Sequence, residues 1–572
     1  MAKRLAVFLL IMGVFFAGCL TGSNKGSASS YDGECDILII GAGIAGSAAA
    51  LTASDELGAN GKIILLEADS FIGGSFATAG GGWNADISAV NSEGNIKPDW
   101  GTWYAGGGGV KGNGRDIGLN SLRFPQNHGY PDVVKLTKVA AYAFGLRNDS
   151  FAAWGIPMSG NPKESGRSSF LDPDDPKIAG GPAGAKAFAR ALANRDVSKG
   201  GNIQLLLNVR ARSFIFDDKN TVIGVNAEDT RAGNNTKYKF SGKKIIIATG
   251  GYSRNNKMLA EYVSDEVNPG FKKMAQADWF RTVAAKYHLG DGITLALSAG
   301  GVLQKDHYIV FDNGGFCAGY DKDTPDRLPT TPNNYQSAFR AYVFQGMPLL
   351  QMKNYIVVNS EGKRFAGEND DLGIGMGSFG NKMVADGKPP YHVIFSSQEY
   401  MAPNGSWNLV DALNAGANLT GQNEILKDDT LAGLAGKMGI ASANVPDFLN
   451  TVKIYNGYVD AKRDDDFNKD ADFLTKKFID GENGPFFAVK VYPGALSSWG
   501  GIETDWRSRL LDKNRNPIPN LYAAGEVTDR DMFNGIYIGS TSLVLGPTQA
   551  KIAVIDAVSL IKGGQGAPDI VK

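Results

Sequence analysis

Cysteine and histidine are scarce in this chain, and neither sign of charge is in excess. Its 572 residues include three cysteines, Cys19, Cys35 and Cys317, too few for a disulfide framework or a cysteine-ligated zinc or iron–sulfur site. The four histidines are scattered, so we expect no dedicated metal site. Lys and Arg number 58 against 59 Asp and Glu, and this balance argues against a nucleic-acid-binding protein, which usually carries a basic excess.

Glycine, in contrast, is abundant. The chain has 74 glycines, and 43% of its residues are hydrophobic while 20% are charged. A hydrophobic fraction of this size with almost no net charge is typical of a folded protein. The length predicts two or more domains, and the glycine excess indicates many tight turns and close backbone approaches.

The first residues are typical of an export signal. A short apolar run at 5–16 follows two basic residues, and the FAGC segment at 16–19 resembles a bacterial lipoprotein signal whose Cys19 becomes lipidated. The alternative is an ordinary signal peptide with a chance cysteine. We interpret 1–19 as a lipoprotein signal peptide and 20–31, rich in Gly and Ser, as a flexible tether. No later apolar run of about 18 residues is evident. We therefore expect an exported protein, lipid-anchored in the bacterial cell envelope on the periplasmic side or at the cell surface.

A glycine-rich turn opens the folded part of the chain. The apolar run 35–40 (CDILII) favours a buried parallel strand, and GAGIAG at 41–46 follows it directly before a helix-forming segment. In such a motif Gly41 permits the tight turn, Gly43 lets the backbone approach a pyrophosphate, and Gly46 lets the helix pack on the strand. The alternative is a chance glycine turn in another α/β fold.

A second strand, 62–66, ends at Glu67, which is placed to accept hydrogen bonds from an adenosine ribose. Three further segments favour FAD over NAD: the glycine-rich stretch 68–85, the strand 244–251 ending in Ala-Thr-Gly-Gly, and the strand 520–528 containing Gly-Glu. No second GxGxxG follows a strand, so we expect no NAD(P)H site.

These motifs, in this order, resemble the FAD-dependent fumarate reductase/succinate dehydrogenase flavoprotein superfamily, in particular its soluble flavocytochrome c and urocanate reductase-like members. GDG at 290–292 and GGI at 500–502 add to the resemblance, which runs from residue 36 to the C-terminus. It implies an α/β fold: a Rossmann-like FAD-binding domain over 32–302 and 498–572, with an inserted α+β substrate-clamping, or capping, domain over 303–497.

The resemblance also implies how the cofactor is held. FAD would be non-covalent, Glu526 would bond the ribityl hydroxyls, and backbone N–H groups near Ser542 and Leu543 would support negative charge on the flavin. No c-type haem domain is visible, so electrons would come from or go to an external partner such as a quinol-linked cytochrome or a flavoprotein, as in anaerobic respiration. The implied cofactor residues are Gly41, Gly43, Ala45, Gly46, Glu67, Gly74, Ser75, Gly81, Gly82, Val209, Ala248, Thr249, Gly250, Asp291, Glu526, Ser542 and Leu543.

The substrate side departs from the resemblance. The position of the proton-donating arginine falls on Leu372, and the clamping histidine falls near Ser497. A second carboxylate-binding arginine falls on Tyr537, and the proton-relay glutamate and arginine fall on Pro348 and Gln351. The cations that would grip a dicarboxylate are therefore replaced, and we expect a less charged substrate.

The catalytic candidates that remain are Tyr537, His307, Tyr308 and Ser497. Tyr537 is the predicted proton-transfer residue, unless it only packs over the flavin edge. His307 is either a substrate-side group or a buried structural histidine. Arg364 is interpreted as a structural ion pair rather than a catalytic group.

We therefore expect an FAD-dependent oxidoreductase acting on CH–CH bonds of a small molecule, reducing an activated C=C bond such as an enone or enoate. Two alternatives stay open. A tyrosine before Gly-x-x also resembles ketosteroid dehydrogenases, which would make the chain a dehydrogenase of a cyclic ketone. The chain could also be a non-catalytic electron-transfer flavoprotein.

Overall fold

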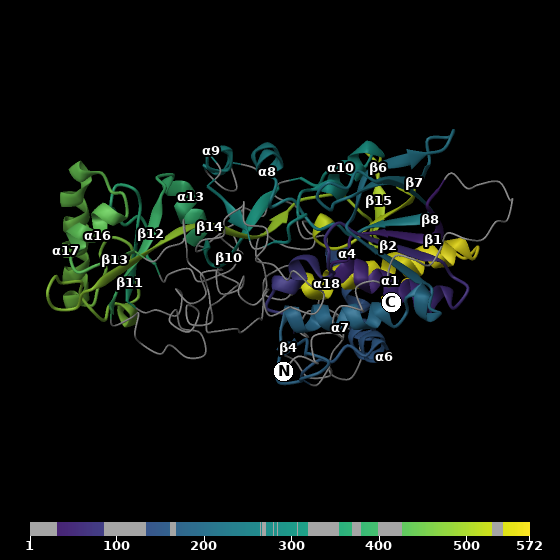
Figure 1. The fold of residues 1–572 in the computed structure, drawn as a ribbon, viewed down its shortest axis with the longest axis horizontal. Coiled ribbons are helices and arrows are strands. Elements are labelled where there is room, and N and C mark those ends of the chain that lie inside the picture. Colours follow the sequence, from purple (N-terminus) through teal and green to yellow (C-terminus); the bar gives the residue numbers. More distant parts are fainter. Residues whose placement is uncertain are drawn as a thin grey trace, which may run out of the picture.

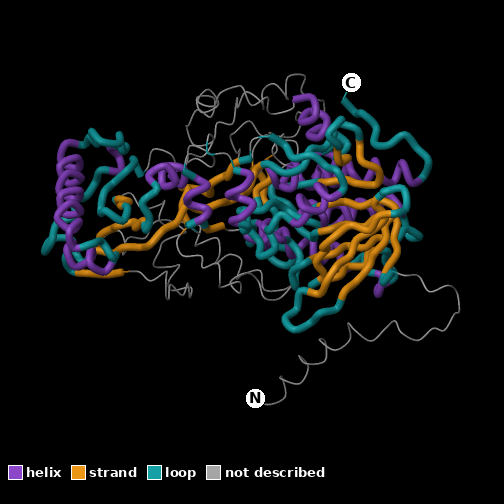
Figure 2. The backbone as a smooth tube through the Cα atoms, turned by 90° about the horizontal axis from the view of Figure 1, so that it is seen from above, coloured by secondary structure: helices purple, strands orange, loops and turns teal. Residues whose placement is uncertain are grey.

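The computed structural model shows two large sheets with their helices and a small two-stranded sheet. The described residues are 31–84, 133–160, 167–263, 265, 270–277, 279–282, 284–305, 307–317, 354–368, 379–397, 426–528 and 541–571. Figure 1 shows the first sheet at one end of the long axis and helices α16 and α17 at the other. The view from above in Figure 2 separates the same two ends.

The first sheet has eight strands and a parallel centre. Its main path runs β15-β16-β8-β1-β2-β5, and β8, β1, β2, β5 and β16 pair in parallel, while β6 and β7 form an antiparallel pair beside β8. The strands are β1 (Gly33–Ile40), β2 (Ile63–Glu67), β5 (Ile203–Leu207), β6 (Val209–Phe216), β7 (Val222–Asp229), β8 (Lys237–Ile247), β15 (Arg509–Leu511) and β16 (Pro517–Ala523).

The apolar runs of the sequence form these strands because both faces of the sheet are covered. In β1, Ile37 and Ile39 enter one hydrophobic core, while Leu38 and Ile40 enter another on the opposite face. All four side chains are at most 4% exposed. A strand buried on both faces requires a continuous apolar run, as the sequence predicted.

Helices α1 (Ile44–Leu57) and α18 (Thr541–Ile561) pack against each other below the first sheet. The stretch 542–561 is long and apolar enough to cross a membrane, contrary to the expectation that no such run follows the signal segment, but 72% of its most apolar window is buried inside the protein. That burial is typical of a core helix. The hydrophobic core on this face also takes residues from α4 (Val133–Ala141), α5 (Ala143–Gly145), α6 (Ala152–Trp154), α7 (Gly181–Ala193) and β3 (Gly82–Asn84). Strand β3 pairs with β4 (Arg167–Ser169) in a small two-stranded sheet.

The second sheet has six strands organised around the long strand β14 (Phe486–Trp499). β14 pairs with β9, β10, β12 and β13, and its C-terminal end points back toward the first sheet (Figure 1). The other strands are β9 (Arg281–Thr282), β10 (Tyr308–Cys317), β11 (Tyr355–Val358), β12 (Tyr391–Ser396) and β13 (Leu426–Asp428). The helices near this sheet are α8 (Asn256–Tyr262), α9 (Phe271–Gln276), α13 (Phe379–Asp386), α16 (Leu431–Lys437) and α17 (Val445–Ala461). Helix α10 (Asp291–Ser298) lies beside β6 of the first sheet (Figure 1).

A buried group of four charged side chains lies near the second sheet. Arg364 donates to Glu368 Oε1 at 2.8 Å and to Asp464 Oδ2 at 2.7 Å, and Lys469 Nζ lies 3.5 Å from Glu368 Oε2. Each of these side chains is at most 4% exposed. Burial lowers the pKa of Lys469 to about 8, although Glu368 opposes this. We call these four residues the ion network. Arg364 is thus in a structural ion pair.

Candidate active site

The predicted nucleotide segments meet at one edge of the first sheet. Gly41 follows β1, Glu67 ends β2, Ala248 follows β8, and Glu526 lies beyond the end of β16. These four strands are parallel neighbours, so their carboxyl ends lie together. The carboxyl edge of a parallel sheet is where ligands of α/β proteins bind.

The glycine turn after β1 is tightly packed at Gly41 and Gly46 but has open space at Gly43. Gly41 has φ +99°, a conformation that favours glycine, and a Cβ at Gly46 would overlap the carbonyl oxygen of Gly41. A Cβ at Gly43 would meet only Gly73 O, at 3.9 Å. The turn therefore keeps bare backbone facing open space at the start of α1, where a helix N-terminus favours phosphate, and the residues fit a dinucleotide.

Glu67 fixes this turn from the neighbouring strand. Its Oε2 accepts from the N–H of Ala42 at 2.7 Å, and its Oε1 accepts from the N–H of Asp69 at 2.8 Å. Burial raises the pKa of Glu67 to about 7, and the two backbone hydrogen bonds work against that rise. The predicted ribose ligand is therefore a buried carboxylate beside the glycine turn.

A second glycine-rich segment lies against the turn. Gly73 N donates to Ala42 O at 2.8 Å, so Gly74 begins its short helix next to Gly43. Ser75 Oγ accepts from the N–H of Ala285 at 3.1 Å. The predicted residues Gly81 and Gly82 lie farther along, where Gly81 packs on the backbone of 180–181 and Gly82 begins β3.

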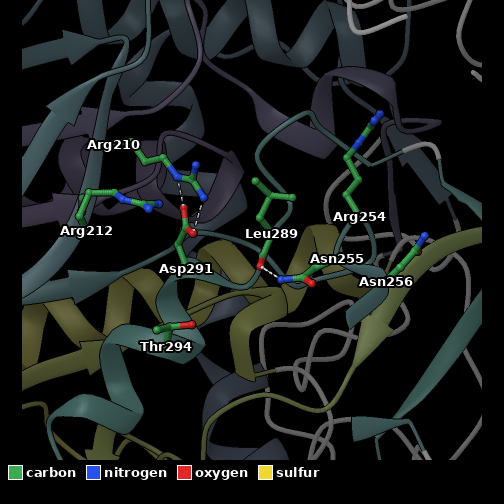
Figure 3. Close-up of a pocket in the computed structure, with 9 residues that line it drawn as sticks. Arg210, Arg212, Arg254, Asn255, Asn256, Leu289, Asp291 and Thr294 are labelled. Atoms are coloured by element: carbon green, nitrogen blue, oxygen red, sulfur yellow. Dashed lines mark hydrogen bonds and ion pairs between the residues drawn. The ribbon is translucent and has the colours of Figure 1, made fainter. Parts of the chain in front are cut away.

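Asp291 lines an open pocket of about 550 Å³, and Val209 begins β6 one residue before Arg210, which lines the same pocket. Arg210 bonds Asp291 through two nitrogens, both at 2.7 Å, and both residues line the pocket (Figure 3). The predicted cofactor residue Asp291 therefore has an arginine partner that the sequence did not indicate. Arg254, Asn255 and Asn256 line the opposite side of the pocket (Figure 3).

The first turn of α18 carries Ser542 and Leu543, at the positive end of the helix dipole. One turn on, a Cβ at Gly546 would lie 3.2 Å from the Cα of Gly525 and 3.9 Å from the Cβ of Ala45. The helix N-terminus is thereby brought to the edge that holds the glycine turn and Glu526. The positive end of a helix dipole favours negative charge.

His307 is held by two hydrogen bonds within the protein. Its Nε2 lies 3.0 Å from the carbonyl of Gln304, and its Nδ1 lies 2.8 Å from the hydroxyl of Tyr252. A carbonyl can only accept, so Nε2 carries the ring proton and Tyr252 donates to Nδ1. His307 is 5% exposed, and burial raises the pKa of Tyr252 well above its usual value. This geometry favours the structural alternative for His307.

Ser497 and Ser498 are neighbours near the end of β14 with different surroundings. Ser497 is 7% exposed, and its hydroxyl has no hydrogen-bond partner among the residues that the structure describes. Ser498 is fully engaged: its N–H donates to Glu526 Oε1 at 2.9 Å, and its Oγ accepts from the N–H of Tyr252 at 2.8 Å. Ser497 is therefore the hydroxyl with capacity for a ligand.

Other predicted substrate-side positions lie outside the described residues: Tyr537, Leu372, Pro348 and Gln351. Tyr308 begins β10 opposite Trp499, and its side chain is not among those described.

Sequence reasoning missed His288, which contacts Glu526. The ring is 3% exposed, and its Nε2 lies 2.8 Å from Glu526 Oε2. The one available signal is its position two residues before Gly290-Asp291-Gly292, since nothing in the residue pattern connects it to a glutamate 238 positions away.

Comparison with known proteins gives a family and several relatives. The family described as FAD binding domain matches residues 36–311 and 329–543. The chain is 24% identical over 514 residues to fumarate reductase (cytochrome) of Shewanella frigidimarina, covering 88% of this chain and 73% of that protein. It is 24% identical over 530 residues to urocanate reductase of Eggerthella lenta, covering 92% and 75%. It is also 26% identical over 349 residues to 3-oxosteroid 1-dehydrogenase of Mycolicibacterium smegmatis, covering 57% and 54%.

Two solved structures share the fold. The open conformation of a flavocytochrome c3 fumarate reductase matches with a TM-score of 0.61 at 20% identity, covering 94% of this chain and 81% of that one. The 3-ketosteroid Δ1-dehydrogenase of Sterolibacterium denitrificans matches with a TM-score of 0.62 at 17% identity, covering 92% and 100%. The expected α/β FAD-binding fold is confirmed.

Proposed function

This chain belongs to the FAD-binding domain family and is an FAD-dependent oxidoreductase, and we propose that it saturates an activated carbon–carbon double bond of a small molecule. Its relatives include enzymes named for the reduction of fumarate and urocanate, which supports chemistry at such a bond. We propose an enone or enoate as substrate rather than a simple dicarboxylate.

The observation that supports this substrate class is the buried hydroxyl of Ser497. The resemblance places a clamping histidine near this position, and the chain instead has a buried hydroxyl with no partner among its described neighbours. A buried polar group without a hydrogen bond costs about 1–3 kcal/mol, which a carbonyl or hydroxyl of a substrate would offset. A neutral hydroxyl suits a neutral polar group better than a second carboxylate.

Bound FAD would supply the hydride, and the chain would hold the cofactor, orient the substrate and provide a proton. We propose that FAD is bound non-covalently, at the edge formed by the glycine turn, Glu67 and Glu526. We propose Tyr537 as the proton donor, because a phenol with a pKa of about 10 stays neutral and can act as an acid. The segment 303–497 would form the substrate-clamping domain.

The deciding experiment is anaerobic turnover of dye-reduced protein with a panel of enones, enoates and fumarate. We expect consumption of an enone or enoate and little of fumarate. The variant Ser497→Ala should raise KM for the preferred substrate. Its matched control is Ser396→Ala, which removes another buried hydroxyl without a partner among the described residues, on β12. Equal KM values in the two variants would contradict the role of Ser497, and fumarate as the preferred substrate would contradict the substrate class.

A second candidate is dehydrogenation of a cyclic ketone, favoured by the 3-oxosteroid 1-dehydrogenase relative. Oxidised protein with an artificial electron acceptor and a panel of cyclic ketones tests it. Turnover in that assay, with none in the reducing assay, would reverse the proposed direction. No turnover in either the reducing or the oxidising assay would favour the third alternative, a non-catalytic electron-transfer flavoprotein.

We also propose that the protein is exported, carries a lipid on Cys19 and exchanges electrons with an external partner. Cys19 lies outside the described residues, so the signal-like segment 5–19 alone supports the anchor. Cys19→Ala should move the protein out of the membrane fraction, and an unchanged lipid label would contradict the proposal. Acid treatment should release FAD from the chain, and flavin that stays attached would contradict non-covalent binding.

A further inference from the structure

His288 lies at the centre of a buried polar chain that joins three distant segments. Its Nε2 lies 2.8 Å from Glu526 Oε2, and its Nδ1 lies 2.8 Å from Ser253 Oγ. Ser253 Oγ in turn lies 3.0 Å from Thr282 Oγ1. We call these four residues the His288 chain. His288, Ser253 and Thr282 are at most 6% exposed.

The ring has more hydrogen-bond donors around it than it can accept from. The N–H of Ser253 points at Nδ1 from 3.1 Å, and the N–H of Gly251 points at Nε2 from 2.7 Å. A neutral imidazole has one N–H and one lone pair, so it can accept one of these bonds. With the proton on Nδ1, Glu526 would face a lone pair and the Ser253 N–H would lose its acceptor. With the proton on Nε2, Glu526 receives a hydrogen bond and the Ser253 N–H keeps its acceptor, while the Gly251 N–H loses its bond to the ring. A hydrogen bond to a charged carboxylate contributes more than one between neutral groups, so the bond to Glu526 outweighs the one lost at Gly251. The contacts therefore favour the Nε2–H tautomer, donating to Glu526.

The ring also packs on the glycine turn that follows β8. A Cβ at Gly250 would lie 2.8 Å from His288 Cδ2, and a Cβ at Gly251 would lie 3.0 Å from His288 Cε1 and 2.6 Å from Glu526 Oε1. His288 therefore packs against both glycines, and Glu526 packs against Gly251. The other oxygen of Glu526 is held by Ser498 N at 2.9 Å, so both carboxylate oxygens are oriented by donors.

We propose that His288 is a positioning residue for the cofactor: its Nε2–H donates a hydrogen bond to Glu526 and thereby fixes that carboxylate as a hydrogen-bond acceptor toward bound FAD. This rests on the proposed role of Glu526 as an FAD ligand. A charge-assisted bond of this kind typically contributes about tenfold to a hundredfold to an equilibrium constant. The bond also compensates the negative charge beside the flavin, so its loss should disfavour the reduced, more electron-rich flavin.

Two substitutions distinguish the hydrogen bond of Nε2 to Glu526 from the hydrogen bond of Nδ1 to Ser253. In His288→Gln the amide nitrogen replaces Nε2 and keeps a donor for Glu526. In His288→Asn the shorter amide reaches the Nδ1 position and keeps a partner for Ser253, but it has no donor at the Glu526 side. The two variants are matched in chemistry and differ in which neighbour they serve.

The experiment measures release of FAD from diluted holoprotein by flavin fluorescence, together with the midpoint potential of the bound flavin. We expect His288→Asn to raise the FAD dissociation constant about tenfold or more and His288→Gln to stay within about threefold of the wild type. We expect His288→Asn to lower the potential by about 30 mV, which is a tenfold change in the oxidised-to-reduced affinity ratio of a two-electron couple. In a Glu526→Gln background, His288→Asn should add little.

Equal shifts in the Asn and Gln variants would overturn the proposal, because only the Gln variant keeps a hydrogen-bond donor for Glu526. An unchanged dissociation constant and potential in His288→Asn would also overturn it. If Glu526→Gln leaves FAD binding unchanged, the proposed role of Glu526 fails first. None of these readouts uses a substrate, so they are independent of the outcome of the turnover panel. Thermal unfolding of each variant shows that the compared proteins are folded.

Discussion

The glycine turn of the first sheet and the ion network near the second sheet are both buried and polar, but they satisfy their polar groups in opposite ways. The turn uses backbone N–H groups around one carboxylate, Glu67. The ion network uses four charged side chains that bond one another, led by Arg364 and Glu368. A site built from backbone leaves room for a ligand, whereas paired side chains fill their own space and hold segments together.

The largest expected effect is the loss of bound FAD when the glycine turn after β1 is changed. Gly46→Ala would place a Cβ on the carbonyl oxygen of Gly41, so α1 could not keep its place behind the turn. We expect protein without FAD, measured as the flavin-to-protein absorbance ratio. The control is Gly457→Ala on α17, where a Cβ meets no atom within 4 Å, and which should keep full FAD. Normal FAD content in Gly46→Ala would show that the backbone can shift.

The ion network should affect stability and not cofactor binding. Glu368→Gln leaves Lys469 and Arg364 with less buried negative charge, and breaking such an arrangement typically costs about 3–5 kcal/mol of unfolding free energy. Denaturant unfolding measures the loss, and FAD content of the folded fraction should not change. Glu361→Gln, which removes the exposed pair with Lys388, is the control and should have little effect. Loss of FAD from folded Glu368→Gln protein would contradict the separation.

Glu67 should make the stability of FAD-free protein depend on pH. Burial raises its pKa from 4.5 to about 7 in the folded state, so the folded chain binds more protons than the unfolded chain between these values. The unfolding free energy therefore falls as pH rises from about 4.5 to about 7, by roughly 3 kcal/mol in all.

Glu67→Gln should remove this dependence. The difference between the wild-type and variant unfolding profiles isolates Glu67, because other groups titrate in both proteins. Parallel profiles would show that Glu67 stays ionised throughout.

The smallest effect is expected at Tyr252. Tyr252→Phe removes the bond to His307 Nδ1, and one such hydrogen bond contributes about 1 kcal/mol. Thermal unfolding should show a small loss while turnover persists. A large loss of turnover at unchanged stability would instead place His307 in the chemistry.

The sequence predicted the features that depend on local backbone structure, namely the first strand, the glycine turn and the end of the neighbouring strand. The run 35–40 and the GAGIAG turn lie within or directly after one strand, so their roles follow from local pattern, and Glu67 ends the neighbouring strand. The expected structural ion pair of Arg364 is also confirmed. Its partner Asp464 lies 100 positions away, and no local period reports such a contact.

The polar side chains near Glu526 could not be predicted for the same reason. His288, Ser253 and Ser498 come from three segments that meet only after both sheets form. His307 was selected by residue type, but its partner Tyr252 follows the Ala-Thr-Gly-Gly motif without any sign of this contact. Residue type marks a candidate, while its hydrogen bonds depend on tertiary structure.

The shared strand β14 has a consequence for the order in which this protein folds. Four strands of the second sheet, β9, β10, β12 and β13, pair directly with β14, which ends at Trp499. Until a ribosome has synthesised that far, β10 and β12 each lack the neighbour that β14 supplies. Pairings between segments so distant in the chain form slowly. Until β14 has paired, the exposed edges of β10 and β12 favour aggregation. Premature termination before residue 486 should therefore yield insoluble fragments rather than a folded first half.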